Sequence, residues 1–292
     1  EYGGFFTCLD RDGSVYDYNK YMWMQWRIVY MFATLYASEY GKGHSDWLDI
    51  AERGFDFLYA HGRLPDGSYY FELNRKGEPA MAPFSIFSDC FAAMGAAALY
   101  KATGKTEYRA EAESAMASYL RRIPNPKGNY MILANLGCVM RDCLGTDRFE
   151  EDTRSAIRNV MEKFRNPEFR VIFENVRPDG SFDLESCEGR FINPGHGLES
   201  MWFMMRCGEA AGDESLIARA AEYAYEQYEF GLDRRYGGLF YFMDVLGRPH
   251  MELQYDMKLW WPHNEAILAM LHAWRLTGEK KFLDAFLQMD EY

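Results

Sequence analysis

Two segments near opposite ends of the 292-residue chain are copies of one unit. Tyr2 to Met31 and Tyr236 to Met270 both open on Tyr-Gly-Gly, and each later carries a lysine followed by a tryptophan. The two copies align after four extra residues are allowed in the second connecting loop. Internal repetition of this kind is typical of scaffolds built from similar units that pack against their neighbours.

At two aligned positions of this repeat, a different polar residue occurs in each copy. Gln25 aligns with His263, and Arg27 aligns with Glu265, whereas Trp23 is matched by another tryptophan, Trp261. A repeat that served packing alone would match mainly at apolar positions. The exchanges predict a symmetric scaffold that carries a non-symmetric site.

Five glycines divide the chain into helical hairpins. Each ends an amphipathic or apolar run and precedes another, with spacings of 63, 41, 67 and 66 residues: Gly41, Gly104, Gly145, Gly212 and Gly278. A glycine that ends one helix, followed closely by an N-cap residue of the next, is typical of two antiparallel helices. Other turns predict short β-hairpins in the connecting loops: Asp12-Gly13, Asp66-Gly67, Asp179-Gly180 and Gly237-Gly238.

Five hairpins of this period predict an all-α fold. We expect an (α/α)6 toroid with short β-hairpins in its loops, formed as a single domain by residues 1–292. A closed ring of six needs one further hairpin. Because the sequence opens at Glu1 inside a repeat loop and stops at Tyr292, we expect it to lack the first helix and the last inner helix.

Composition restricts the class of partner. The net charge of −12 argues against nucleic acid or an anionic membrane as the main partner. No apolar run reaches the roughly 20 residues needed to span a bilayer. The six cysteines form no Cys-x-x-Cys pair and have no histidine at zinc spacing, so we expect reduced thiols, a cytoplasmic location and no metal site.

Several hairpins carry a charged side chain at a similar distance before their glycine. They stand 13 to 15 residues before the hairpin glycine, roughly 20 Å away along a helix: Arg27, Asp89, Glu199 and Glu265. If the first helices line an inner ring, their positive N-terminal ends converge on one mouth and favour an anion there. We expect Asp89, Glu199 and the aromatic Trp23 and Trp261 to contact a sugar at this mouth.

Two histidines enter the expected mouth after a proline. His196 lies in Asn-Pro-Gly-His-Gly-Leu-Glu, and His263 lies in Trp-Trp-Pro-His-Asn-Glu. His196 shares a helical face with Glu199, three residues later. Each histidine is either a side chain that caps its helix or a general base, because a neutral imidazole at a helix start has a lowered pKa.

Several motifs resemble those of the N-acylglucosamine 2-epimerases. They occur in the same order from near Gly3 to near Arg275: GGFFTCLDRDG, KYMWMQWR, IFSDCF, ENV followed by a loop, NPGHGLE, YGGLFYF and MKLWWPHNEA. The resemblance implies an (α/α)6 barrel that interconverts N-acyl-D-glucosamine and N-acyl-D-mannosamine. The implied chemistry removes the C2 proton of an open-chain sugar and stabilises an enediolate.

The same resemblance implies roles for individual residues. Arg27 would bind O1, His196 would transfer the proton, and Glu265 would orient a hydroxyl or assist ring opening. Relatives carry a further His-x-Pro-Arg-like segment near the C-terminus, which this sequence lacks before Tyr292. His263 is then the candidate for the second acid–base group. The resemblance implies no cofactor, although a nucleotide is an effector of some relatives.

Other functions remain open from the sequence. An aldose–ketose isomerase, or a 2-epimerase of non-acetylated sugars such as mannose or cellobiose, would use the same enediolate. A glycoside hydrolase on the same barrel would use a carboxylate pair drawn from Asp89, Glu199 and Glu265. A third alternative is a non-catalytic binding protein, because fold alone does not decide function. We expect a small-molecule amino sugar as the substrate, and a homodimer.

Overall fold

The structure, a computed structural model, describes residues 2–123 and 130–292. The chain forms two compact units: unit 1 is Glu1–Pro124 with Val139–Phe149, and unit 2 is Asn125–Cys138 with Glu150–Tyr292. None of the helices in the described residues has the length and apolar character that a membrane crossing requires. The single domain expected over the whole chain stays a prediction.

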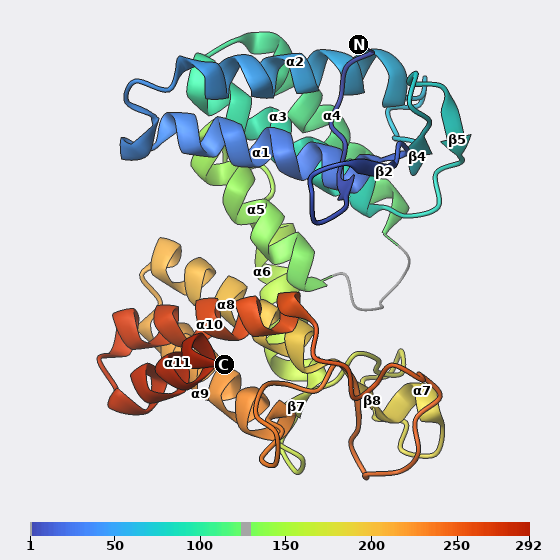
Figure 1. Ribbon diagram of the computed structural model, residues 1–292. Coiled ribbons are helices and arrows are strands. Elements are labelled where there is room, and N and C mark those ends of the chain that lie inside the picture. Colours follow the sequence, from blue (N-terminus) through green and yellow to red (C-terminus); the bar gives the residue numbers. More distant parts are fainter. Residues whose placement is uncertain (1, 124–129) are drawn as a thin grey trace. The chain divides into compact units, whose positions relative to one another are not determined.

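Unit 1 contains two helical hairpins (Figure 1). The first joins α1 (Met22–Ala37) through the 3-10 turn η1 (Glu39–Gly41) to α2 (Ser45–Gly62), and the second joins α3 (Phe87–Thr103) to α4 (Thr106–Arg122). α1 packs against α3, so the first helices of the two hairpins are neighbours. Antiparallel strands occupy the loops: β1 (Cys8–Leu9) with β2 (Val15–Asp17), and β3 (Lys20–Tyr21) with β4 (Glu72–Leu73) and β5 (Pro79–Met81).

Unit 2 repeats this plan with longer loops. Its helices are part of α5 (Tyr130–Leu144), then α6 (Glu150–Arg158), the π-helical η2 (Asn159–Phe164), α7 (Cys187–Arg190), α8 (Pro194–Ala211), α9 (Glu214–Gly231), α10 (Trp260–Thr277) and α11 (Lys280–Glu291). Two antiparallel strand pairs lie in its loops: β6 (Arg165–Asn166) with β7 (Val171–Ile172), and β8 (Phe191–Ile192) with β9 (Met243–Asp244). α8 packs against both α9 and α10, so first helices are again neighbours.

Glycine ends most of the first helices, as predicted. Gly104, Gly212 and Gly278 adopt the left-handed conformation at the C-terminal ends of α3, α8 and α10. Gly41 differs, because α1 already ends at Ala37 and Gly41 closes the 3-10 turn. A Cβ there would lie 2.0 Å from the Tyr36 carbonyl oxygen, so Gly41 is needed for close approach of the backbone. The predicted all-α class with short β-hairpins in the loops is confirmed.

One hydrogen bond recurs where a first helix meets the loop before it. Gln25 Oε1 accepts the N–H of Phe5 at 2.8 Å, and the Gln25 amide donates to the Phe5 carbonyl at 2.9 Å. His263 Nε2 accepts the N–H of Leu239 at 3.0 Å. Phe5 and Leu239 are aligned in the sequence repeat. The exchanged residues Gln25 and His263 therefore perform one structural task in the two copies.

In two more hairpins a buried side chain also accepts a backbone N–H of a loop. Asp89 stands 15 residues before its glycine, as His263 does, and its Oδ1 accepts the N–H of Tyr69 at 2.9 Å. In α8 the equivalent position is Gly197, where a Cβ would lie only 2.4 Å from Gln227 of α9. Gln227 Oε1 reaches into this space and accepts the N–H of Ile172 at 2.9 Å. We call these four buried side chains the loop pins: Gln25, Asp89, Gln227 and His263.

The loop pins predict a stability pattern. His263→Ala should lower the free energy of unfolding by about 1–3 kcal/mol, because the fully buried Leu239 loses the acceptor for its N–H. His263→Gln should lose less, because Gln25 already makes this bond at the aligned position. Urea unfolding of both variants measures the difference. Equal losses in the two variants would contradict the assignment of His263 as a pin.

Candidate active site

His196 occupies the first turn of α8 without capping it. Asn193 is the N-cap, and its side-chain oxygen accepts the N–H of His196 at 3.2 Å. Pro194 follows at the first helical position, where a missing N–H costs little. The local sequence therefore satisfies the helix end with Asn193. The His196 ring, 40% exposed, is left to make other contacts.

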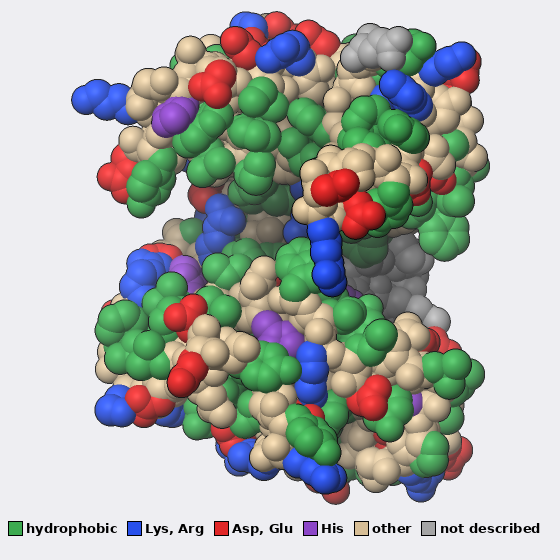
Figure 2. All heavy atoms as spheres, in the orientation of Figure 1, with side chains coloured by type: hydrophobic (Ala, Val, Ile, Leu, Met, Phe, Trp, Pro, Cys, Tyr) green, Lys and Arg blue, Asp and Glu red, His purple; other side chains and the backbone are tan. Residues whose placement is uncertain are grey.

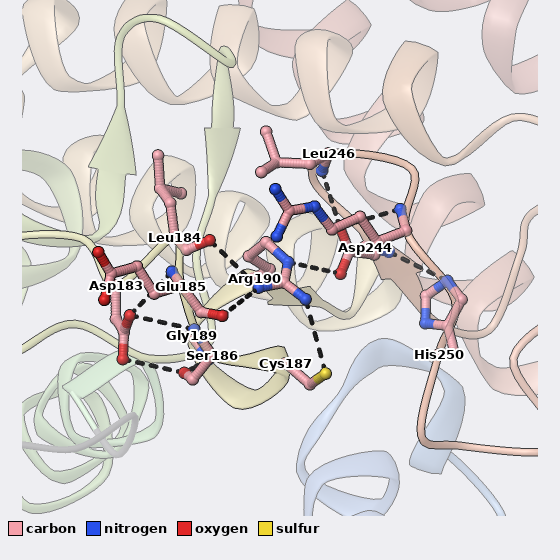
Figure 3. A network of polar contacts seen from close by, with 11 residues as sticks. Asp183, Leu184, Glu185, Ser186, Cys187, Gly189, Arg190, Asp244, Leu246 and His250 are labelled. Atoms are coloured by element: carbon pink, nitrogen blue, oxygen red, sulfur yellow. Dashed lines mark hydrogen bonds and ion pairs between the residues drawn. The ribbon is translucent and has the colours of Figure 1, made fainter.

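A buried ion pair fixes the loop that leads into α8 (Figure 3). Arg190, 3% exposed, donates from Nε to Asp244 Oδ2 at 2.9 Å. Its Nη1 also donates to the carbonyls of Leu184 and Glu185, so the guanidinium joins the segment before α7 to β9. β8 follows Arg190 directly and pairs with β9. This network sets the approach of the chain to Asn193 and thereby the position of His196.

Glu174 is the partner of His196, and sequence reasoning missed it. Its Oε2 lies 2.9 Å from His196 Nδ1, and its side chain is 21% exposed. Glu174 follows two residues after Ile172, whose N–H is held by the loop pin Gln227. No spacing in the sequence connects Glu174 with a residue 22 positions away. The ENV segment that contains it was the only available signal.

The other side of the imidazole meets an aromatic ring. The His196 and Trp261 ring centroids are 5.2 Å apart, with 36° between the planes. Glycine permits this approach, because a Cβ at Gly195 would lie 2.5 Å from the Trp261 ring. Trp261 belongs to the first turn of α10, so the N-terminal ends of α8 and α10 lie side by side.

Carboxylates control the charge of His196. Burial lowers the pKa of the imidazole, but the charge and hydrogen bond of Glu174, followed by the charges of Glu199 and Glu265, raise it to about 9. The group is therefore an imidazolium at neutral pH. This outcome differs from the lowered pKa expected at a helix N-terminus, because the three carboxylates outweigh the effect of burial.

Glu265 is oriented by a tryptophan from the neighbouring helix. Trp202 of α8 donates its Nε1–H to Glu265 Oε2 at 2.6 Å. Both side chains are half-buried. Unit 2 thus brings together four of the predicted site residues, His196, Glu199, Glu265 and Trp261.

Arg27 and Trp23 lie together in unit 1. The exposed Arg27 guanidinium lies 5.7 Å from the centroid of the Trp23 ring and 5.2 Å from that of Phe91 on α3. Among the described residues, no carboxylate lies within 4.0 Å of Arg27. Arg27 and His196 belong to different units, so the cavity expected to contain both stays a prediction.

Two predicted site residues have internal roles instead. Asp89 is fully buried: its Oδ1 holds Tyr69, and its Oδ2 accepts from the Ser118 hydroxyl at 2.8 Å and from Arg122 at 2.6 Å. His263 uses both ring nitrogens, since Nδ1 donates to the Leu259 carbonyl at 2.5 Å and Nε2 accepts from Leu239. We therefore withdraw Asp89 as a substrate contact and His263 as an acid–base group.

A cavity of about 380 Å³ in unit 2 lies beside the Arg190 network. Its walls include Cys187, Phe191, Asp244 and His250, and none of the predicted site residues. No group of three or more His, Cys, Asp or Glu side chains in residues 2–123 and 130–292 is arranged to hold a metal ion. On the face shown in Figure 2, acidic and basic side chains are interspersed across each unit.

An imidazole–carboxylate pair beside tryptophans on a helical-hairpin scaffold is suited to proton transfer in an aromatic-lined site. The family model of N-acylglucosamine 2-epimerase (GlcNAc 2-epimerase) matches residues 4–292. The N-acylglucosamine 2-epimerase of Rattus norvegicus is 35% identical over 314 residues, covering 100% of this chain and 74% of the relative. The chain belongs to the N-acylglucosamine 2-epimerase family.

Solved structures agree on the fold. The cellobiose 2-epimerase of Bacillus thermoamylovorans matches with a TM-score of 0.83 and 16% identity, covering 100% of this chain and 80% of that one. A D-mannose isomerase matches with a TM-score of 0.84 and 16% identity, covering 99% and 80%. The cellobiose 2-epimerases among these structures are (α/α)6 barrels, the fold that the hairpin pattern predicted.

The charge of His196 predicts a pH-dependent contribution to stability. Its pKa rises from an ordinary 6.5 to about 9 on folding, so the stabilisation is fully present below 6.5 and is lost as pH rises through 9. His196→Asn keeps a donor toward Glu174 but has no charge. Its deficit in unfolding free energy should shrink between about pH 6 and about pH 10 in denaturant titrations. Because the ring is 40% exposed, water weakens the effect. A constant deficit would contradict the ion pair.

Proposed function

We propose that this protein is a sugar 2-epimerase that interconverts an N-acyl-D-glucosamine and the corresponding N-acyl-D-mannosamine. The observation that carries the proposal is the half-exposed His196 imidazole held by Glu174 in a member of this family. An imidazole oriented by a carboxylate is suited to transfer a proton to or from carbon. The family implies a small-molecule sugar substrate, and the N-acyl amino sugar is our specific assignment.

The reaction begins on the open-chain aldose. A base removes the proton from C2, and the electron pair of the broken C–H bond delocalises into the aldehyde to form an enolate with negative charge on O1. Return of a proton to the opposite face of C2 produces the other epimer. No carbon is oxidised or reduced overall, so the proposal requires no redox cofactor. The nucleotide effector of some relatives stays a prediction for this chain.

Positive groups stabilise the developing charge in this proposal. We assign Arg27 to O1, because an unpaired guanidinium supplies two parallel donors to an oxyanion. The adjoining N-terminal ends of α8 and α10 supply further positive potential. Glu265, oriented by Trp202, would hold a sugar hydroxyl or assist ring opening. Glu199 and Trp261 complete the substrate contacts.

A second candidate reaction is aldose–ketose isomerisation. On a sugar with a hydroxyl at C2, loss of the C2 proton gives an enediolate, and return of the proton to C1 gives a ketose. A D-mannose isomerase shares the fold of this chain. The hydrolase alternative is weaker, because Asp89, one of its three candidate carboxylates, is fully buried and held by internal bonds. The non-catalytic alternative gives no reason for the Glu174–His196 pair.

Proton NMR of N-acetylmannosamine incubated with the protein in D2O tests the reaction class. We expect deuterium at C2 together with a gluco-configured product, because solvent exchanges with the catalytic groups between the two proton transfers. In a parallel incubation with mannose, a ketose product would favour the isomerase. Absence of both exchange and product would contradict catalysis at C2. His196→Asn is the matched control and should form no epimer.

Arg27 should be essential to turnover. Arg27→Ala should lower kcat by roughly 100-fold or more, as expected for the loss of a donor to an oxyanion. Arg27→Lys should restore little, because a point charge does not replace a planar two-donor contact or its stacking on Trp23 and Phe91. Steady-state kinetics with N-acetylmannosamine measures both variants. Near-normal kcat in either one would remove Arg27 from the mechanism.

Two further expectations concern the protein in solution. Light scattering at several concentrations tests the predicted homodimer. The cytoplasmic location also stays a prediction, and fractionation of the source cells would test it.

A further inference from the structure

Three carboxylates face the His196 ring from three segments. Glu174 comes from the loop after β7, Glu199 from α8 itself, and Glu265 from α10. Glu174 binds the ring directly, through Nδ1 at 2.9 Å. Trp261, which is uncharged, packs against the ring. The two ring nitrogens therefore differ: Nδ1 is held by Glu174, and Nε2 is the nitrogen through which His196 meets a substrate.

We propose that Glu174 is the positioning residue of the reaction: it holds the Nδ1–H of His196, keeps the ring in its imidazolium form in the resting enzyme, and so makes His196 the proton donor to C2. This inference rests on the proposed function. In this direction of the reaction, a base on the opposite face of C2 takes the C2 proton and leaves the enolate; in the reverse direction the two groups exchange roles. The Nε2–H bond of His196 then breaks, its proton forms the new bond to C2, and a neutral imidazole remains.

The structure supports this assignment in three ways. The carboxylate is held in place, because Glu174 follows the β6–β7 pair and the loop pin Gln227 at Ile172. The ring is also fixed, because Asn193 caps the helix and Trp261 covers one side of the imidazole. The pKa of about 9 means that nearly all molecules carry the imidazolium at neutral pH.

The variant Glu174→Gln tests the effect of the Glu174 charge on His196, because it changes the charge of the side chain but hardly its shape. The amide oxygen still accepts the Nδ1–H bond, but the negative charge is lost. The basic limb of the pH profile of kcat/KM, expected near 9 in the wild-type enzyme, should move to lower pH. The shift should be equal in both reaction directions, because the equilibrium constant between the epimers does not depend on pH.

Two comparison variants separate this effect from general damage. Glu188→Gln removes the same charge from an exposed position on α7 and should leave the basic limb in place. Glu174→Asp retains the charge on a shorter side chain. It should lower kcat while it restores the basic limb. A purely structural role for Glu174 would lower activity in both Glu174 variants without moving the limb.

A substrate-free measurement distinguishes this inference from the proposed function. In protein with labelled histidine, NMR should show one imidazole titrating at about 9, absent from His196→Asn, and the same signal should titrate closer to 6.5 in Glu174→Gln. If that shift occurs but the wild-type enzyme forms no epimer, the proposed function fails and the His196 proton-donor role fails with it, although the ion pair stands. If neither the titration nor the basic limb moves in Glu174→Gln, the positioning role is overturned.

Discussion

Each unit depends on a buried side chain that accepts a loop N–H at the start of a first helix. A loop that crosses a helical core leaves backbone donors without water, and each unpaired donor costs about 1–3 kcal/mol. Gln25, Asp89 and His263 meet this requirement with different acceptors, and Gln227 does so through the gap above Gly197. Because the pins attach the loops to the helices, they also decide where the helix N-termini open.

Two residues after each pin position comes the side chain that gives each hairpin its chemical character. These positions hold Arg27, Phe91, Glu199 and Glu265. Neighbouring first helices bring such residues together, as the contact between Arg27 and Phe91 shows within unit 1. A symmetric scaffold thus places a cation, an aromatic ring and two carboxylates at equivalent steps. The loop pins play the same structural role in each hairpin. The positions two residues later differ in chemical character, and these are the positions available for a non-symmetric site.

The sequence predicted the helical hairpins well because their signals are local. Gly104, Gly212 and Gly278 end helices by their own conformational freedom, and Asn193-Pro194 starts one. The roles of Asp89 and His263 were misassigned from the sequence, because a loop pin and a catalytic group show the same sequence pattern. Both are polar residues at the start of an apolar helix. For His263, the alignment with Gln25, an unsuitable acid or base, was the available warning.

The sequence by itself determined the repeat, the hairpins, the family motifs and the candidacy of His196, since each depends on residues close together in the chain. Tertiary structure decided what each polar side chain does. Glu174 meets His196 only because the loop after β7 returns to the start of α8, and that contact changes the expected neutral base into a cation. His263, with the same residue type and a similar approach, becomes a pin because its ring faces Leu239 and Leu259. Charge and function follow from what a side chain faces, which local sequence does not specify.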